Sequence, residues 1–348
     1  MTESADRVRA WEPPESWERI VTLDAHTAGE PLRVILGVFP EFPGRTMLEV
    51  RRFAQEFHDD LRRALMLEPR GHADMYGCYV LPPVSPRADI GVLFTHNEGY
   101  STMCGHGIIA VTTALLETGV LEAREPKTLV RIDTPAGFIE SWATVRHGRV
   151  EEVAFINVRS FVVGLDREVD VPGIGPVRYD LAFGGAFYAY VDAEDFGFRM
   201  VPEESRRMID WGRRIKAAVQ EADPPSHPLD SDLSFLYGTI FTGPAHHPGA
   251  HSRNVCVFAD GEVDRSPTGT GVSGRMAIHH ARGELPVGEE FIVESILGTT
   301  FEGRLTGTGE VGHLPAVVPE ITGNAYLTGR NEILIAPDDP LAEGFVIR

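Results

Sequence analysis

The sequence contains only three cysteines among 348 residues, Cys78, Cys104 and Cys256, and they lie far apart. Three scattered cysteines cannot build a disulfide framework, and an odd number leaves at least one free thiol. No run of 18 apolar residues occurs, and residues 1–18 lack the apolar segment of a secretory signal. These absences predict a cytoplasmic protein without a membrane partner.

Basic residues are also scarce, with 32 Lys and Arg against 51 Asp and Glu, a formal net charge of −19. A nucleic-acid-binding surface needs a basic stripe, and no Lys/Arg cluster stands out, so we expect no nucleic-acid partner. A small anionic substrate would have to be held locally against this overall charge. Backbone N–H groups at a helix N-terminus provide that kind of site.

The length exceeds that of a usual single domain, so two domains of about 150 residues are expected. Hydrophobic residues make up 43% of the chain and charged residues 24%, which is typical of a soluble globular protein. Apolar residues at helical spacing predict surface helices over residues 49–65 and 203–220. Short β-rich runs predict strands at residues 21–23, 32–38, 90–94, 129–132, 153–158, 254–258 and 291–293. The fold class is therefore α/β or α+β.

One pattern occurs twice when the chain is shifted by 164 residues. In both copies an apolar strand leads through a polar loop into a Gly-x-Gly turn and a helix. The turns are Cys104-Gly105-His106-Gly107-Ile108 and Thr268-Gly269-Thr270-Gly271-Val272. The expected helices, residues 108–118 and 272–281, each stop at a glycine, Gly119 or Gly283. The repeat predicts two similar domains, each directing a helix N-terminus into a common cleft.

Cys104 stands in the first turn of its expected helix, where unpaired N–H groups and the helix dipole favour a thiolate. A thiolate there is a plausible base, and the neighbouring glycines leave room for a ligand. For Cys78 and Cys256, flanked by aromatic or β-branched residues, we expect ordinary buried side chains. An amino-acid carboxylate bound between the two helix starts would place its α-carbon between positions 104 and 268.

Other motifs are weaker. Gly269 to Gly274 matches the dinucleotide fingerprint G-x-G-x-x-G, but residues 260–268 separate it from the preceding strand, so we do not expect a nicotinamide cofactor. No HExxH, CxxC or GxSxG motif occurs. Five histidines are clustered in sequence but lack a ligand set, so no metal site is expected and they are interpreted as surface residues: His246, His247, His251, His279 and His280.

The two helix starts resemble the paired signatures of the proline racemase family, in Met103-Cys104-Gly105-His106-Gly107 and Asp264-Arg265-Ser266-Pro267-Thr268-Gly269-Thr270-Gly271. Further matches are Asp24-Ala25-His26-Thr27-Ala28-Gly29-Glu30-Pro31, Arg70-Gly71-His72-Ala73-Asp74-Met75-Tyr76-Gly77, Asp133-Thr134-Pro135-Ala136-Gly137 and Arg253-Asn254-Val255-Cys256. The resemblance implies a two-domain fold like diaminopimelate epimerase, a homodimer, and no cofactor. It also implies that five residues bind the substrate: Gly105, His106, Asp264, Gly269 and Thr270.

Racemases and epimerases of this family resemble one another in having cysteine at both signatures, whereas this chain has Thr268 at the second. A threonine hydroxyl is too basic to exchange a proton efficiently at neutral pH, so two-base racemisation should fail. Members with this Cys/Thr pair resemble trans-3-hydroxy-L-proline dehydratases. Cys104 would remove the α-proton, and loss of water would lead to Δ1-pyrroline-2-carboxylate. Whether Thr268, His106 or a water protonates the leaving hydroxyl stays open.

Ile240 occupies the position where hydroxyproline epimerases of the family tend to have a histidine, 28 residues before the second cysteine. That replacement disfavours 4-hydroxyproline as a substrate, because a hydroxyl without a partner in an apolar pocket is rejected. Proline racemase or hydroxyproline 2-epimerase activity and a non-catalytic amino-acid-binding role remain the alternatives. We expect residues 18–157 plus 338–348 to form the domain carrying Cys104, with a final strand at 344–348, and residues 158–337 the domain carrying Thr268.

Overall fold

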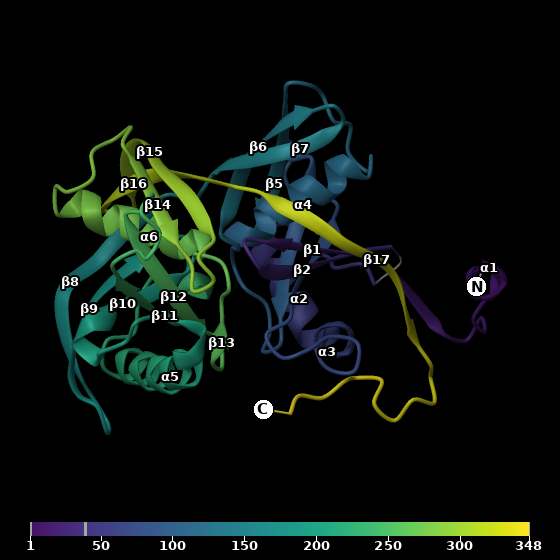
Figure 1. Cartoon of the computed structure of the whole chain (residues 1–348), viewed down its shortest axis with the longest axis horizontal. Helices are drawn as coiled ribbons and strands as arrows, with labels where there is room; N and C mark the ends of the chain where they lie inside the picture. The colour runs from purple at the N-terminus through teal and green to yellow at the C-terminus, as the bar shows by residue number, and fades with distance from the viewer. Residues whose placement is uncertain (1, 38–39, 348) are drawn as a thin grey trace.

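The computed structural model describes residues 2–37 and 40–347, and in it the chain forms two halves that lie side by side (Figure 1). The first half contains β1 (Glu18–Thr27), β2 (Glu30–Leu36), α2 (Met47–Phe57), α3 (Asp59–Met66), β3 (Tyr76–Leu81), β4 (Ile90–His96), α4 (Gly105–Glu117), β5 (Lys127–Thr134), β6 (Gly137–Arg146), β7 (Arg149–Ile156) and β17 (Ala325–Ile335). A separate helix, α1 (Thr2–Ala10), precedes them and stands at the edge of the molecule in Figure 1.

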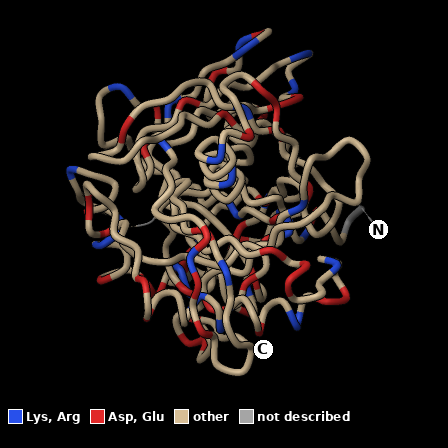
Figure 2. The backbone as a smooth tube through the Cα atoms, turned by 90° about the vertical axis from the view of Figure 1, so that its left-hand side faces the viewer, with Lys and Arg blue, Asp and Glu red and all other residues tan. Residues whose placement is uncertain are grey.

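The second half contains β8 (Ser160–Val171), β9 (Gly175–Phe183), β10 (Phe187–Asp192), α5 (Ser205–Ala222), β11 (Leu236–Gly243), β12 (Ser252–Phe258), β13 (Glu262–Val263), α6 (Gly269–Ala281), β14 (Glu290–Glu294), β15 (Thr300–Val311) and β16 (Leu314–Gly323). Short 3-10 helices lie at η1 (Ala193–Phe196), η2 (Pro202–Glu204) and η3 (Ser231–Leu233). Acidic and basic residues are mixed over the periphery in Figure 2 and form no single basic face in that view.

Each half wraps its strands around one central helix. In α4 every residue from Gly105 to Leu116 is buried, and α6 is buried over most of its length. A helix that is apolar all round is stable only when it is covered on every side. Strands β1, β2, β6, β7 and β17 contact α4, whereas β8, β9, β15 and β16 contact α6. The central position of both helices follows from this composition.

The two halves share one order of strand pairing, which confirms the internal repeat and the predicted mixed α/β fold of two pseudo-symmetric domains. In the first half, β2 and β3 are parallel, β3 and β4 antiparallel, and β4 and β5 parallel. In the second half, β10, β11, β12 and β14 repeat these three relations. The helices between the last two strands, α4 and α6, have 13 residues each. Both are followed by a glycine at positive φ, Gly119 at 74° and Gly283 at 75°.

The seven predicted strands are present, although Val38, at the end of the run 32–38, lies outside the described residues. The helix predicted over 203–220 is α5, but the one predicted over 49–65 is two helices, α2 and α3, with His58 between them at φ −139°. Asp59 and Asp60 begin α3, where acidic side chains favour a new helix N-terminus. Phe57, one of the apolar residues at helical spacing from which this helix was predicted, is 57% exposed.

The prediction of a final strand at 344–348 was wrong. The strand that returns to the first half is β17, which pairs with β1 from Ala325 onward, before the expected limit at 338. Of the predicted segment only Phe345 makes a bridge, to Glu68, and Arg348 lies outside the described residues. The error has a physical cause, because the middle of β17, residues 328–332, is polar and largely exposed and lacks the apolar alternation of a half-buried strand. The other predicted limit, near residue 157, falls between β7 and β8 and stays a prediction.

Candidate active site

The N-termini of α4 and α6 meet at a pair of glycines. A Cβ atom added to Gly105 would lie 2.8 Å from the Cα atom of Gly269, and one added to Gly269 would lie 3.0 Å from the Cα of Gly105. Any larger residue at either position would push the helices apart. The close approach brings the residues before the two glycines, Cys104 and Thr268, into the same cavity.

This cavity has a volume of about 20 Å³ and is lined from both halves, as the predicted cleft requires. That volume admits about one water molecule and is well below the size of a small-molecule site, so an amino-acid ligand needs the two halves to move apart. All seven residues singled out from the sequence line it: Cys104, Gly105, His106, Asp264, Thr268, Gly269 and Thr270. Six lining residues were not predicted: Tyr76, Met103, Tyr188, Tyr237, Cys256 and Phe258. Tyr76 and Cys256 belong to family-like motifs, and Met103 precedes Cys104. The other three come from strands without a distinctive motif.

Cys104 is the N-cap of α4, and its sulfur accepts a hydrogen bond from the Gly107 N–H at 3.3 Å. Burial raises the pKa of the Cys104 thiol well above its usual range. The Gly107 N–H lowers it, and the charge of Asp264 raises it further. The helix start does favour a thiolate, but burial is the larger influence. The protein alone therefore holds Cys104 as a thiol.

His106 lies next to this thiol, with its Nδ1 atom 3.1 Å from the Cys104 sulfur. Burial lowers the pKa of His106 to about 4, although Asp264 and the backbone of Pro31 act in the opposite direction. The imidazole is consequently neutral at neutral pH. A neutral ring with a free nitrogen lone pair can accept the thiol proton.

The lowered pKa of His106 predicts a loss of stability in acid. Its folded-state pKa, about 4, lies below the ordinary value of 6.5, so between these pH values the unfolded chain binds a proton that the folded chain does not. Stability should therefore fall by about 3 kcal/mol as the pH drops from 6.5 to 4. Urea unfolding of the wild type and of His106→Gln across this range measures the contribution. Equal pH dependence in the two proteins would contradict it.

Thr268 is the N-cap of α6 in an unusual backbone conformation, with φ 64° and ψ 91°. Positive φ is strained for a β-branched residue and marks a position set by its surroundings. Its hydroxyl donates to Asp264 Oδ2 at 2.8 Å and makes no cap bond to α6. Asp264 Oδ1 accepts the N–H of Ser266 at 2.7 Å. The start of α6 therefore has no side-chain cap, so its N–H groups are available to an anion.

The loop before α6 is tied to the first half through Glu30 and Arg265. A Glu30 carboxylate oxygen accepts the Arg265 N–H at 2.7 Å, and the Arg265 guanidinium lies 3.4 Å from the same oxygen. Arg265 also donates to the carbonyl of Asp74 at 3.2 Å. Burial, together with the nearby charge of Asp264, raises the pKa of Glu30 well above its usual range. These contacts hold Asp264 and Thr268 in position across the two halves.

The glycines of the apparent dinucleotide fingerprint serve packing instead. Gly269 contacts Gly105, and a Cβ atom added to Gly274 would lie 2.1 Å from the Tyr190 hydroxyl oxygen. The segment follows β12 only after a loop containing β13, unlike the direct strand-to-helix turn of a dinucleotide site.

The five clustered histidines lie outside the cavity. His246, His247 and His251 are exposed, and His279 and His280 are half-buried. Across residues 2–37 and 40–347, no group of three or more His, Cys, Asp or Glu side chains is arranged to hold a metal ion. Within the same ranges, no helix combines the length and the apolar character needed to cross a membrane.

Two like halves with a cysteine and a threonine at facing helix N-termini define an epimerase-type α/β protein. The sequence pattern described as "Proline racemase" matches residues 22–346, and the chain belongs to that family. A protein of Colwellia psychrerythraea named trans-3-hydroxy-L-proline dehydratase is 45% identical, over 100% of this chain and 99% of the relative. A 3-hydroxyproline 2-epimerase of Burkholderia multivorans is also 45% identical, over 94% of this chain and 98% of the relative.

Among solved structures, a hydroxyproline epimerase from Agrobacterium vitis with bound trans-4-hydroxy-L-proline superposes with a TM-score of 0.89. It is 35% identical, and the match covers 94% of this chain and 96% of that one.

Proposed function

We propose that this protein is a trans-3-hydroxy-L-proline dehydratase, a hydro-lyase that forms Δ1-pyrroline-2-carboxylate without a cofactor. The observation that carries the proposal is the pair Cys104 and Thr268 at facing helix starts, a base opposite a residue that cannot return a proton. The 45% identity to the Colwellia relative of that name supports it. We further propose that the protein is a cytoplasmic homodimer, with two domains that meet near residue 157.

The substrate carboxylate would bind between the two helix N-termini. The start of α6 has no side-chain cap, and at the start of α4 the Cys104 sulfur accepts the backbone N–H of Gly107. Backbone N–H groups from Gly105, His106, Gly269 and Thr270 are therefore candidates to hold the carboxylate from both sides. They would also stabilise the negative charge that develops when the α-proton leaves. This arrangement overcomes the unfavourable net charge of the protein.

The ring ammonium of the substrate would sit beside Asp264, the acidic side chain lining the cavity. A cation there favours the Cys104 thiolate and so opposes the raised pKa of the thiol. His106, neutral and 3.1 Å from the sulfur, would relay the thiol proton toward solvent, because its pKa of about 4 prevents it from keeping that proton. The base would thus form when the substrate is bound, and it would then remove the α-proton.

Thr268 determines the step after proton removal. Its hydroxyl donates a hydrogen bond to Asp264. An alcohol is also too weak an acid to give a proton to a carbanion efficiently at neutral pH. The carbanion therefore expels the neighbouring hydroxyl as water. The resulting enamine tautomerises to the cyclic imine.

A second candidate is 3-hydroxyproline 2-epimerase activity, because a relative of that name is equally similar. This reaction needs a proton donor on the far face, the position that Thr268 occupies. A binding protein without turnover is the candidate from another class. The three candidate functions would use the same cavity. The dehydratase would form an imine, the epimerase would form an epimer, and the binding protein would form no product.

Incubating the pure protein with trans-3-hydroxy-L-proline tests the proposal. We expect a cyclic imine, detected with o-aminobenzaldehyde, in proportion to the substrate consumed. Chiral chromatography of the same mixture detects any cis-3-hydroxy-D-proline. Epimer without imine would establish the second candidate, and binding without either product would establish the third.

A further inference from the structure

Tyr76 brings a phenol hydroxyl to the Cys104 side of the cavity. It begins β3 in the first half, lines the cavity, and is fully buried within it. Its hydroxyl lies close enough to Cys104 to lower the pKa of that thiol. Its ring also meets the His106 ring edge to face, with centroids 4.9 Å apart. The base and this phenol therefore share one side of the site.

The stereochemistry of the substrate decides which side the leaving group faces. In trans-3-hydroxy-L-proline the hydroxyl and the carboxylate lie on opposite faces of the ring, so the hydroxyl and the α-hydrogen lie on the same face. A base that takes the α-hydrogen consequently faces the leaving hydroxyl as well. We propose that Tyr76 donates the proton that converts this hydroxyl into water. The inference rests on the proposed dehydratase activity.

Two other polar groups of the cavity, Thr268 and His106, are less suited to this task. Thr268 belongs to the opposite helix start, and its hydroxyl proton is already donated to Asp264. His106 is engaged by the Cys104 sulfur and by the backbone of Pro31. Its low pKa leaves it without a spare proton at neutral pH. Tyr76 keeps its proton, because burial raises the pKa of its phenol well above the usual range.

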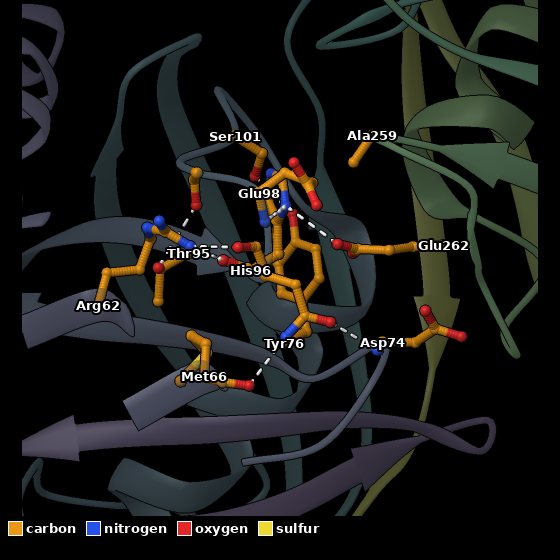
Figure 3. Close-up of polar contacts among 12 residues, drawn as sticks. Arg62, Met66, Asp74, Tyr76, Thr95, His96, Glu98, Ser101, Ala259 and Glu262 are labelled. Atoms are coloured by element: carbon orange, nitrogen blue, oxygen red, sulfur yellow. Dashed lines mark hydrogen bonds and ion pairs between the residues drawn. The ribbon is translucent and has the colours of Figure 1, made fainter. Parts of the chain in front are cut away.

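Several neighbouring side chains fix the orientation of Tyr76, and Figure 3 draws two of them, Ser101 and His96. Its hydroxyl shares hydrogen bonds with Ser101 and, at 3.3 Å, with the Tyr237 hydroxyl. Its ring stacks on His96, with centroids 5.6 Å apart. His96 lies at the end of β4, and its Nδ1 is 3.6 Å from a carboxylate oxygen of Glu262 in β13 of the second half. Glu262 of the second half therefore helps to hold His96, and His96 in turn packs against the Tyr76 ring.

Cys104 and Tyr76 together account for every proton that moves in the reaction. The Cα–H bond breaks, its proton goes to the Cys104 thiolate, and its electron pair forms the double bond between Cα and C3. The C3–O bond breaks, and the departing oxygen takes the Tyr76 proton and leaves as water. The new Cys104 thiol then returns its proton to the Tyr76 phenolate, which lines the same cavity. The α-proton ends on Tyr76, the water carries the proton that Tyr76 held at the start, and both residues regain their initial states.

Tyr76→Phe tests the inference, with Tyr179→Phe as a matched control. Tyr179 is also buried, but its hydroxyl bonds Asp223 in a different core cluster. Three reactions are compared: imine formation from trans-3-hydroxy-L-proline, fluoride release from trans-3-fluoro-L-proline, and uptake of α-deuterium by L-proline in D₂O. Fluoride leaves without full protonation, and L-proline has no leaving group. The second and third reactions therefore depend on Cys104 but not on an acid.

We expect Tyr76→Phe to lower dehydration about 100-fold or more, in the range for loss of a general acid. Fluoride release and deuterium uptake should fall much less than dehydration, only by the effect of the lost hydroxyl on the Cys104 pKa, and their turnover also shows that the variant is folded. Dehydration at the wild-type rate would overturn the inference alone, and so would an equal loss of all three reactions. A wild type that forms no imine would overturn the proposed function, and the inference with it.

Discussion

Cys104→Ser is expected to lower kcat/KM for trans-3-hydroxy-L-proline by about 10⁴-fold, the upper range for removal of a catalytic base. Serine is nearly the same size and keeps the N-cap position at the start of α4, where its oxygen can accept the Gly107 N–H. It lacks a conjugate base that forms near neutral pH. The imine assay measures the loss, and α-deuterium uptake should disappear with it.

Cys78→Ala is the matched control for this variant. Cys78 is fully buried in β3, and burial raises the pKa of its thiol without any neighbouring charge. It does not line the cavity. The control should keep its turnover, and Cys104→Ser should still be stabilised by the substrate in thermal unfolding. Substantial imine formation by Cys104→Ser would instead assign the base to another group.

The candidate site could be predicted because the residues proposed for it occur in short, repeated segments. Cys104 and Thr268 occupy equal places in the repeat, and small residues such as Gly105 and Gly269 mark the helix starts in the sequence. Their packing against each other is a direct consequence of lacking a Cβ atom. The repeat, in which Cys104 of the first copy corresponds to Thr268 of the second, thus indicated a shared cavity and the chemical difference between its two sides.

Other features depend on the folded chain as a whole. Tyr188 and Tyr237 reach the cavity from β10 and β11, and nothing in their local sequence separates them from ordinary core residues. The pKa of Cys104 depends on how completely both halves cover it, which its position at a helix start does not reveal. The polar middle of strand β17, residues 328–332, has no apolar alternation, so its pairing with β1 was missed. In each case the deciding contact is distant in sequence.

Thr268→Cys is expected to give the enzyme a second activity, the conversion of trans-3-hydroxy-L-proline into cis-3-hydroxy-D-proline. A thiol at 268 would stand across the cavity from Cys104 and could protonate the carbanion on the far face. Cysteine is not β-branched, so it should adopt the positive φ of this position with less strain than threonine. Chiral chromatography measures the epimer, and the imine assay measures the dehydration that competes with it.

Thr268→Ser is the control for this experiment, because it keeps a hydroxyl that can donate to Asp264 and should form no epimer. The thiol in Thr268→Cys would face the same carboxylate, which raises the pKa of a neighbouring thiol and keeps it protonated. A protonated thiol is the state needed to quench the carbanion, so epimer should form even if the reverse reaction is slow. A complete absence of epimer, with dehydration intact, would show that the choice between the two reactions also depends on residues besides 268. Tyr76, on the face where the hydroxyl departs, would be the next position to change.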